Sequence, residues 1–96
     1  MRSFAAFYLF FYYYFMNIYV GNLNYRIREN DLKSVMEQYG TVDYVKVVKD
    51  RDTGRSKGFA FVEMPDDDEA RRAIEELNEK DFEGRKMVVK EALPRT

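Results

Sequence analysis

The segment KGFAFVEM (57–64) has apolar side chains on both faces of the strand that it predicts. Successive side chains of a strand point to opposite faces, so Phe59 and Phe61 share one face. The other face carries Ala60, Val62 and Met64. Either this strand is buried on both sides, or one side presents two phenyl rings to something other than water.

The segments around it predict one α+β domain with the element order β-α-β-β-α-β. Alternating apolar residues predict strands at NIYVG (17–21), TVDYVKVVKD (41–50), KGFAFVEM and MVVKEA (87–92). Apolar residues at helical spacing predict helices in ENDLKSVMEQYG (29–40) and DDDEARRAIEELN (66–78). Asp66 follows Pro65 and is the expected N-cap of the second helix.

This order predicts a ferredoxin-like split βαβ plait, in which two helices cover one face of a four-stranded antiparallel sheet. The covered face and the helices are expected to form the core. The predicted core residues are Ile18, Val20, Leu32, Met36, Val45, Val47, Ala60, Val62, Met64, Ala70, Ala73, Ile74, Leu77, Met87 and Val89. The opposite face is expected to carry Tyr19, Tyr44, Phe59 and Phe61, and nothing in the predicted domain remains to cover them except the N-terminal segment.

Composition restricts the chemistry of the chain. Its 96 residues include neither Cys nor His, so thiolate metal sites, disulfides and the commonest general base are absent. An enzyme of this composition would have to use carboxylates, Lys or Tyr. We expect no metal, no cofactor and no enzymatic activity. The net charge is −1, so any polyanion site must depend on local clusters of Lys and Arg.

The first fifteen residues, MRSFAAFYLFFYYYF, differ from the rest of the chain: they hold more than half of its aromatic residues and only one charged side chain, Arg2. Three interpretations stay open: an extension before an alternative start at Met16, an element that packs on the domain, and a membrane or signal segment. We expect no membrane contact, because this run overlaps the first predicted strand. The domain is expected to span 16–94, with a short tail at 95–96.

The segment at 57–64 resembles the first ribonucleoprotein motif of the RNA recognition motif family, [KR]-G-[FY]-[GA]-[FY]-V-x-[FY]. The segment IYVGNL (18–23) resembles the partner motif on the first strand. The two stand in the right order within the right succession of elements. One position departs from the pattern, because Met64 replaces the last aromatic residue. By alternation Met64 points into the core, so the change is expected to affect packing only.

The resemblance implies that single-stranded RNA binds on the sheet, with bases stacking on Tyr19, Phe59 and Phe61. Further contacts are expected from the start of the third strand and the loop before it, and from side chains that frame the rings. These residues are Lys57, Arg55, Arg51, Tyr44, Lys46 and Lys90. Glu63 lies on the same face. Two interpretations are open: it accepts a hydrogen bond from a base amino group, or it neighbours a lysine, and we expect the second. Gly21 and Gly40 are expected to have structural roles.

The expected function is non-catalytic binding of single-stranded RNA in a post-transcriptional role in the cytoplasm, with single-stranded DNA as the alternative nucleic acid. A protein–protein interaction module on the same fold is the alternative function, but such variants commonly lose the exposed rings. A phosphatase on this plait would need a Gly-rich anion loop after the first strand, and GNLNYR (21–26) has a single Gly. The sequence does not predict the RNA sequence preference or the oligomeric state.

Overall fold

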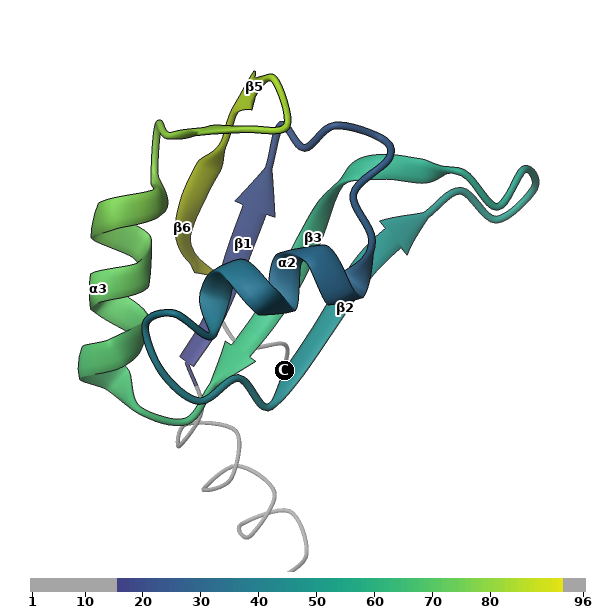
Figure 1. The fold of residues 1–96 in the computed structure, drawn as a ribbon. Coiled ribbons are helices and arrows are strands. Elements are labelled where there is room, and N and C mark those ends of the chain that lie inside the picture. Colours follow the sequence, from purple (N-terminus) through teal and green to yellow (C-terminus); the bar gives the residue numbers. More distant parts are fainter. Residues whose placement is uncertain (1–15, 93–96) are drawn as a thin grey trace, which may run out of the picture.

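The computed structural model describes residues 16–92, and the predictions for 1–15 and for the tail at 95–96 lie outside them. The described residues form two helices and six strands (Figure 1). In chain order these are β1 (Met16–Gly21), α2 (Glu29–Met36), β2 (Tyr44–Lys49), β3 (Ser56–Met64), α3 (Asp67–Leu77), β4 (Asp81–Phe82), β5 (Arg85–Lys86) and β6 (Val88–Ala92). The predicted βαββαβ order is confirmed, with one small hairpin, β4–β5, inserted before the last strand.

The main sheet has the strand order β2-β3-β1-β6, and all of its pairs are antiparallel. Strands β3 and β1 are therefore central. Tyr19 lies opposite Phe61 of β3 on one side and opposite Lys90 of β6 on the other. Both helices lie on one face of this sheet, as Figure 1 shows. The predicted plait is thus confirmed, and both motif segments occupy its two central strands.

The start of each helix is fixed by a carboxylate. At α3 the side chain of Asp66 accepts a hydrogen bond of 2.9 Å from the N–H of Glu69, which confirms the predicted N-cap. At α2 the side chain of Asp31 accepts from the N–H of Arg28 at 3.0 Å. Helix α2 ends at Met36, about one turn before the predicted end, and its chain continues in turns toward Gly40.

The core lies between the helices and the covered face of the sheet. Most predicted core residues are buried, Met64 among them, whereas Val45 and Ile74 are only partly buried. Leu23 and Ile27, which the sequence places in a loop, are 1% and 4% exposed. The segment between β1 and α2 is therefore part of the core, where the N–H of Leu23 donates to the carbonyl of Gly58 at 2.9 Å.

Gly58 explains why a glycine stands in the opening segment. Its φ is +82°, in the left-handed region that side chains disfavour. The register between β2 and β3 shifts beside Gly58. Val47 pairs with Ala60, but the next pair is Lys49 with Ser56. Strand β3 thus contains a bulge, which bends the strand end and redirects the side chains beside it.

The connector between α3 and β6 was predicted without strands, but it forms the hairpin β4–β5. Glu83 and Gly84 occupy its two-residue turn with φ of +50° and +82°, the signature of the tight turns that suit hairpins. Phe82 packs against the core. Among residues 16–92, no helix has the length and apolar character needed to cross a membrane.

Candidate nucleic-acid interface

Three aromatic rings form a continuous cluster on the sheet face opposite the helices. We call Tyr19, Phe59 and Phe61 the aromatic platform. The ring centroids of Tyr19 and Phe59 lie 5.8 Å apart at an interplanar angle of 29°. Phe61 meets Tyr19 edge-on at 5.9 Å and Phe59 edge-on at 6.1 Å. All three side chains are half-buried. The predicted sharing of one face is therefore confirmed, and mutual contacts fix the position of each ring.

The platform depends on a residue that has no side chain. A Cβ on Gly21 would lie 2.5 Å from the hydroxyl oxygen of Tyr19 and 2.6 Å from its Cε1 atom. The Tyr19 ring therefore lies directly over the backbone of Gly21. This places the ring along the strand and within reach of Phe59. Gly21 has a structural role, as predicted, and that role is to position the Tyr19 ring.

Two lysines frame the platform. Lys46 of β2 lies opposite Phe61, and Lys90 of β6 lies opposite Tyr19, so these four residues form one row across the sheet. The Lys90 ammonium lies 5.4 Å from the centroid of the Tyr19 ring, within the range of a cation–π contact. Both lysines are exposed. A nucleotide over the platform would therefore have a cation on each side.

The structure separates the three predicted loop cations. Lys57 and Arg55 line a cavity of about 1100 Å³ at the end of the sheet, together with Phe59 of the platform. Arg51 is exposed on the β2–β3 loop but does not line this cavity. Lys57 and Arg55 are thus adjacent to the rings, whereas Arg51 lies farther out along the loop.

Tyr44 and Glu63 lie opposite each other at the other end of the same face. Tyr44 is 49% exposed, and its ring is not paired with any ring of the platform. Burial and then repulsion from Asp43 raise the pKa of Glu63 above its ordinary value. Among the described residues Glu63 forms no ion pair with a lysine. The registers of β1 and β2 place Asn17 and Tyr44 directly opposite Glu63, and Lys46 follows two residues after Tyr44 on β2.

Several residues of the cavity lining were not selected from the sequence. Tyr25 and Lys49 are two of them, and they line the same cavity as Arg55 and Lys57. Tyr25 is 65% exposed, the largest exposure among the bulky apolar side chains described. An aromatic residue between polar neighbours in the loop segment NYRIR (24–28) is the signal that would have drawn attention to it.

Comparisons with known proteins find similar sequences and similar folds. Residues 18–88 match the family model of the RNA recognition motif. RbpD of Nostoc sp., which is named an RNA-binding protein, is 51% identical over 83% of this chain and 85% of its own length. The crystal structure of the RNA-binding protein PG1 is 63% identical, with a TM-score of 0.82 over 84% of this chain and 98% of that one. The structure of the Rna15 motif with bound RNA (GU) is 29% identical, with a TM-score of 0.72 over 79% and 81% of the two chains.

Proposed function

The chain belongs to the RNA recognition motif family, and from this premise we propose that its aromatic platform binds the bases of single-stranded RNA without catalysing a reaction. The observation that carries the proposal is the contact cluster of Tyr19, Phe59 and Phe61 on the sheet face opposite the helices. Binding of single-stranded RNA is the function that the family and the site support.

The energy of binding is expected to come mainly from stacking. Each base that stacks on an aromatic side chain contributes about 1–3 kcal/mol. A platform of three rings offers positions for two or three bases, and only a strand whose bases are unpaired presents their faces. Single-stranded RNA is therefore the expected ligand and duplex is not. Single-stranded DNA has the same bases and is the alternative nucleic acid.

The charges around the platform suit a phosphate chain. Lys46 and Lys90 stand on either side of the central rings, and Lys57 lies at the start of β3 next to Phe59. Arg55, Arg51 and Tyr44 complete the proposed contact set. Because few phosphates are contacted, the affinity is expected to depend only moderately on salt.

The alternative function, a protein–protein interaction module, uses the same rings as an apolar contact patch. The two functions differ in what the rings must supply. Stacking needs an aromatic face, whereas an apolar contact needs only buried area. Replacement of Phe by Leu removes the aromatic face and retains most of the apolar volume, so it separates the two.

The test measures fluorescence anisotropy of a labelled, randomised single-stranded RNA pool with the full chain. Tyr19→Leu, Phe59→Leu and Phe61→Leu are compared with the parent, and thermal unfolding shows that each variant is folded. Each variant is expected to bind about 5- to 150-fold more weakly, the loss of one stacked base. Unchanged binding in folded variants, or a parent that binds no RNA, would overturn the proposal. Unlabelled DNA and duplex RNA serve as competitors.

A further inference from the structure

Glu63 is the only carboxylate that the strands of the main sheet place beside the aromatic platform. The strands β1, β2, β3 and β6 contain two carboxylates, Glu63 and Glu91. Glu91 stands two residues after the buried Val89, so it belongs to the face that the helices cover. Glu63 stands two residues after Phe61 and shares the platform face. A carboxylate there repels the phosphates of a bound strand, so any favourable contact that it makes with RNA must be with the bases.

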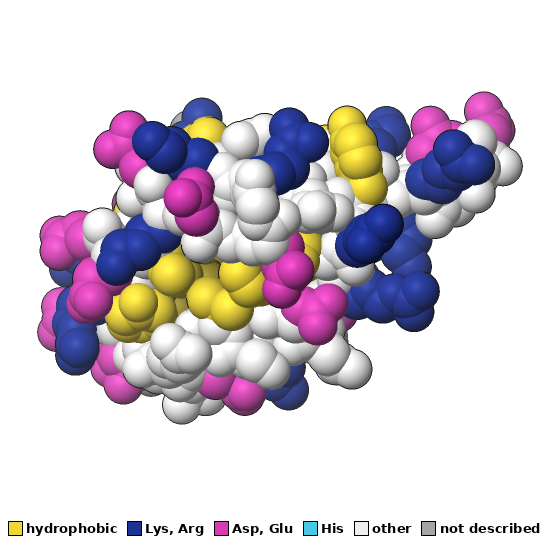
Figure 2. Space-filling model, turned by 45° about the horizontal axis from the view of Figure 1, so that its top comes forward, with side chains coloured by type: hydrophobic (Ala, Val, Ile, Leu, Met, Phe, Trp, Pro, Cys, Tyr) yellow, Lys and Arg dark blue, Asp and Glu magenta, His cyan; other side chains and the backbone are white. Residues whose placement is uncertain are grey.

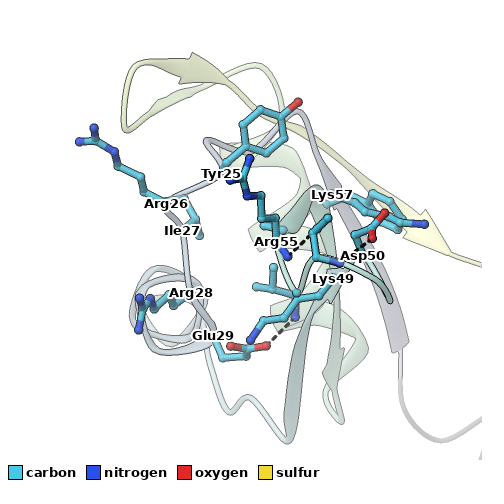
Figure 3. A pocket seen from close by; sticks show the side chains of 14 residues that line it. Tyr25, Arg26, Ile27, Arg28, Glu29, Lys49, Asp50, Arg55 and Lys57 are labelled. Carbon is cyan, nitrogen blue, oxygen red and sulfur yellow. Dashed lines mark hydrogen bonds between the residues drawn. The ribbon is translucent and has the colours of Figure 1, made fainter.

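The Glu63 carboxylate has no partner within the described residues, unlike other carboxylates of the domain. Figure 2 shows Asp and Glu side chains interspersed with Lys and Arg at the left, where α3 lies. There Asp68 forms an ion pair of 3.6 Å with Arg71. Glu29 of α2 accepts a hydrogen bond of 3.0 Å from the N–H of Val47 (Figure 3). Glu63 has neither kind of contact, because no ion pair and no hydrogen bond within residues 16–92 involves its carboxylate.

The same carboxylate is open to a ligand, although its side chain is half-buried. Every fully buried side-chain nitrogen or oxygen in the part of the chain that the structure describes has a hydrogen-bond partner. The unpaired oxygens of Glu63 are therefore within reach of the surface. Burial and then repulsion from Asp43 raise the pKa of Glu63, so its ionised form is disfavoured where it stands. A hydrogen-bond donor supplied by a ligand would relieve this cost.

Strand register places Glu63 one row along the face from the central rings. The row of the rings consists of Lys46, Phe61, Tyr19 and Lys90, and the next row consists of Tyr44, Glu63, Asn17 and Ala92. Successive side chains on one face of a strand are about 6.6 Å apart. A base that stacks on Phe61 can therefore direct one of its edges at the Glu63 carboxylate.

The chemistry of a carboxylate favours one base over the others. An ionised carboxylate only accepts hydrogen bonds, and its two oxygens match a pair of parallel donors. Guanine alone among the RNA bases carries two adjacent donors on its Watson–Crick edge, the N1–H and the 2-amino group. Adenine and cytosine have an acceptor nitrogen beside their amino group, and uracil has a carbonyl on each side of its N–H. Those acceptors repel a carboxylate, so guanine is the base that fits it.

We propose that Glu63 is a specificity-determining residue that selects guanine at the base position on Phe61, by accepting hydrogen bonds from the N1–H and the 2-amino group. The inference rests on the proposed function, because it needs a base stacked on the platform. Hydrogen bonds to an ionised acceptor are stronger than those between neutral groups. Glu63 thus supplies the sequence preference, whereas the rings supply stacking that every base shares.

The experiment titrates the full chain with labelled short RNAs that differ in one base, UUGUU, UUAUU, UUCUU and UUUUU, and follows fluorescence anisotropy. A further RNA carries inosine in place of guanosine, which removes only the 2-amino group. The variant Glu63→Gln keeps the size of the side chain and replaces one acceptor oxygen by a donor. The matched control is Glu91→Gln, which removes the same charge from the covered side of the sheet. Thermal unfolding shows that each variant is folded.

We expect the parent to bind UUGUU about 5- to 150-fold more tightly than UUUUU, the discrimination of one bidentate pair. Inosine is expected to remove most of this preference. Glu63→Gln is expected to bring UUGUU within about 2-fold of UUUUU without weakening UUUUU, because UUUUU makes no bond to the carboxylate. Glu91→Gln should keep the preference of the parent.

Four results overturn the specificity role of Glu63: equal binding of UUGUU and UUUUU by the parent, a guanine preference that survives Glu63→Gln, equal binding of the guanosine and inosine RNAs, or an equal loss of preference in Glu91→Gln. The failure of the proposed function looks different. If the parent binds none of these RNAs, the proposed function itself is wrong. If the parent binds all of them equally and Phe61→Leu weakens all of them, the platform binds RNA and only the role of Glu63 is wrong.

Discussion

The substitution Gly21→Ala tests how the fold positions the platform, because it adds one methyl group and removes no contact. The new Cβ would lie 2.5, 2.6 and 2.7 Å from the Oη, Cε1 and Cζ atoms of Tyr19. Carbon atoms in ordinary contact are about 3.5–4.0 Å apart, so the ring must move by about 1 Å. The backbone of Gly21 has no positive φ, so alanine introduces no backbone strain there.

Movement of the Tyr19 ring disturbs each interaction that holds it. The ring is stacked with Phe59 at 5.8 Å and lies 5.4 Å from the Lys90 ammonium. One stacked base contributes about 1–3 kcal/mol, so complete displacement weakens RNA binding about 5- to 150-fold. Stability is expected to change by less than about 1 kcal/mol. The ring can turn toward solvent, and alanine lowers the entropy of the unfolded chain by about 0.4–1 kcal/mol.

A double-mutant cycle measures whether the effect passes through the ring. Gly21→Ala, Tyr19→Ala and the combined variant are titrated with the same labelled RNA pool, and thermal unfolding is recorded for each. The combined variant is expected to bind as Tyr19→Ala does, because the added methyl then meets no ring. Binding of Gly21→Ala equal to the parent, or losses that add in the combined variant, would refute this account of the platform.

Three further predictions concern stability. Asp66→Ala is expected to cost about 1 kcal/mol, because the N-cap bond of α3 is lost, and to lower the midpoint of thermal unfolding by about 4–8 °C, whereas Asp66→Asn retains most of the bond. Gly58→Ala is expected to cost about 1–3 kcal/mol in urea unfolding, because φ is +82° and a Cβ would lie 3.3 Å from a backbone carbonyl; the control Gly54→Ala, with φ of +72° and open space, should lose less. Glu63→Gln is expected to raise stability at pH 7. Burial and then repulsion from Asp43 raise the pKa of the Glu63 carboxyl in the folded protein. The parent therefore loses stability as pH rises through that pKa. Below pH 4.5, the ordinary pKa, the difference in unfolding free energy between variant and parent should vanish. A difference that persists at low pH would contradict this cause.

Alternation of side chains made the platform predictable. In β1 and β3 the apolar and aromatic residues recur with period two, and this period fixes the face of each residue whatever the exact strand ends. The ends of β1 and β3 differ by at most one residue from those predicted, and Tyr19, Phe59 and Phe61 share the face expected. Alternation also placed Met64 in the core, where it is fully buried.

The β4–β5 hairpin and the buried loop were not predictable in this way. The strands of the hairpin have two residues each, too few to show a period, and its turn uses Glu83–Gly84 rather than the more familiar Asn-Gly. Leu23 and Ile27 lie between elements, so their burial depends on long-range contacts such as the bond from Leu23 to Gly58.

The cavity beside the platform could not be predicted from the sequence for a related reason. Tyr25 and Lys49 are separated along the chain by a complete helix and most of a strand. They line one cavity only because α2 packs on the sheet and the β3 bulge redirects the strand end. The spacing of Tyr25 and Lys49 along the chain does not indicate that they line the same cavity.

The net charge of −1 is a poor guide to RNA binding here because many of the acidic residues lie in the two helices. Acids in the first turns of α2 and α3 complement the helix dipoles, and they lie on the elements that cover the other face of the sheet. Lys46, Lys90 and Lys57 stand beside the rings instead. The Debye length is about 8 Å at physiological salt, so an RNA on the sheet is largely screened from the acids across the domain. We therefore expect a bound strand to respond to the local cations, whose placement beside the platform would determine its path.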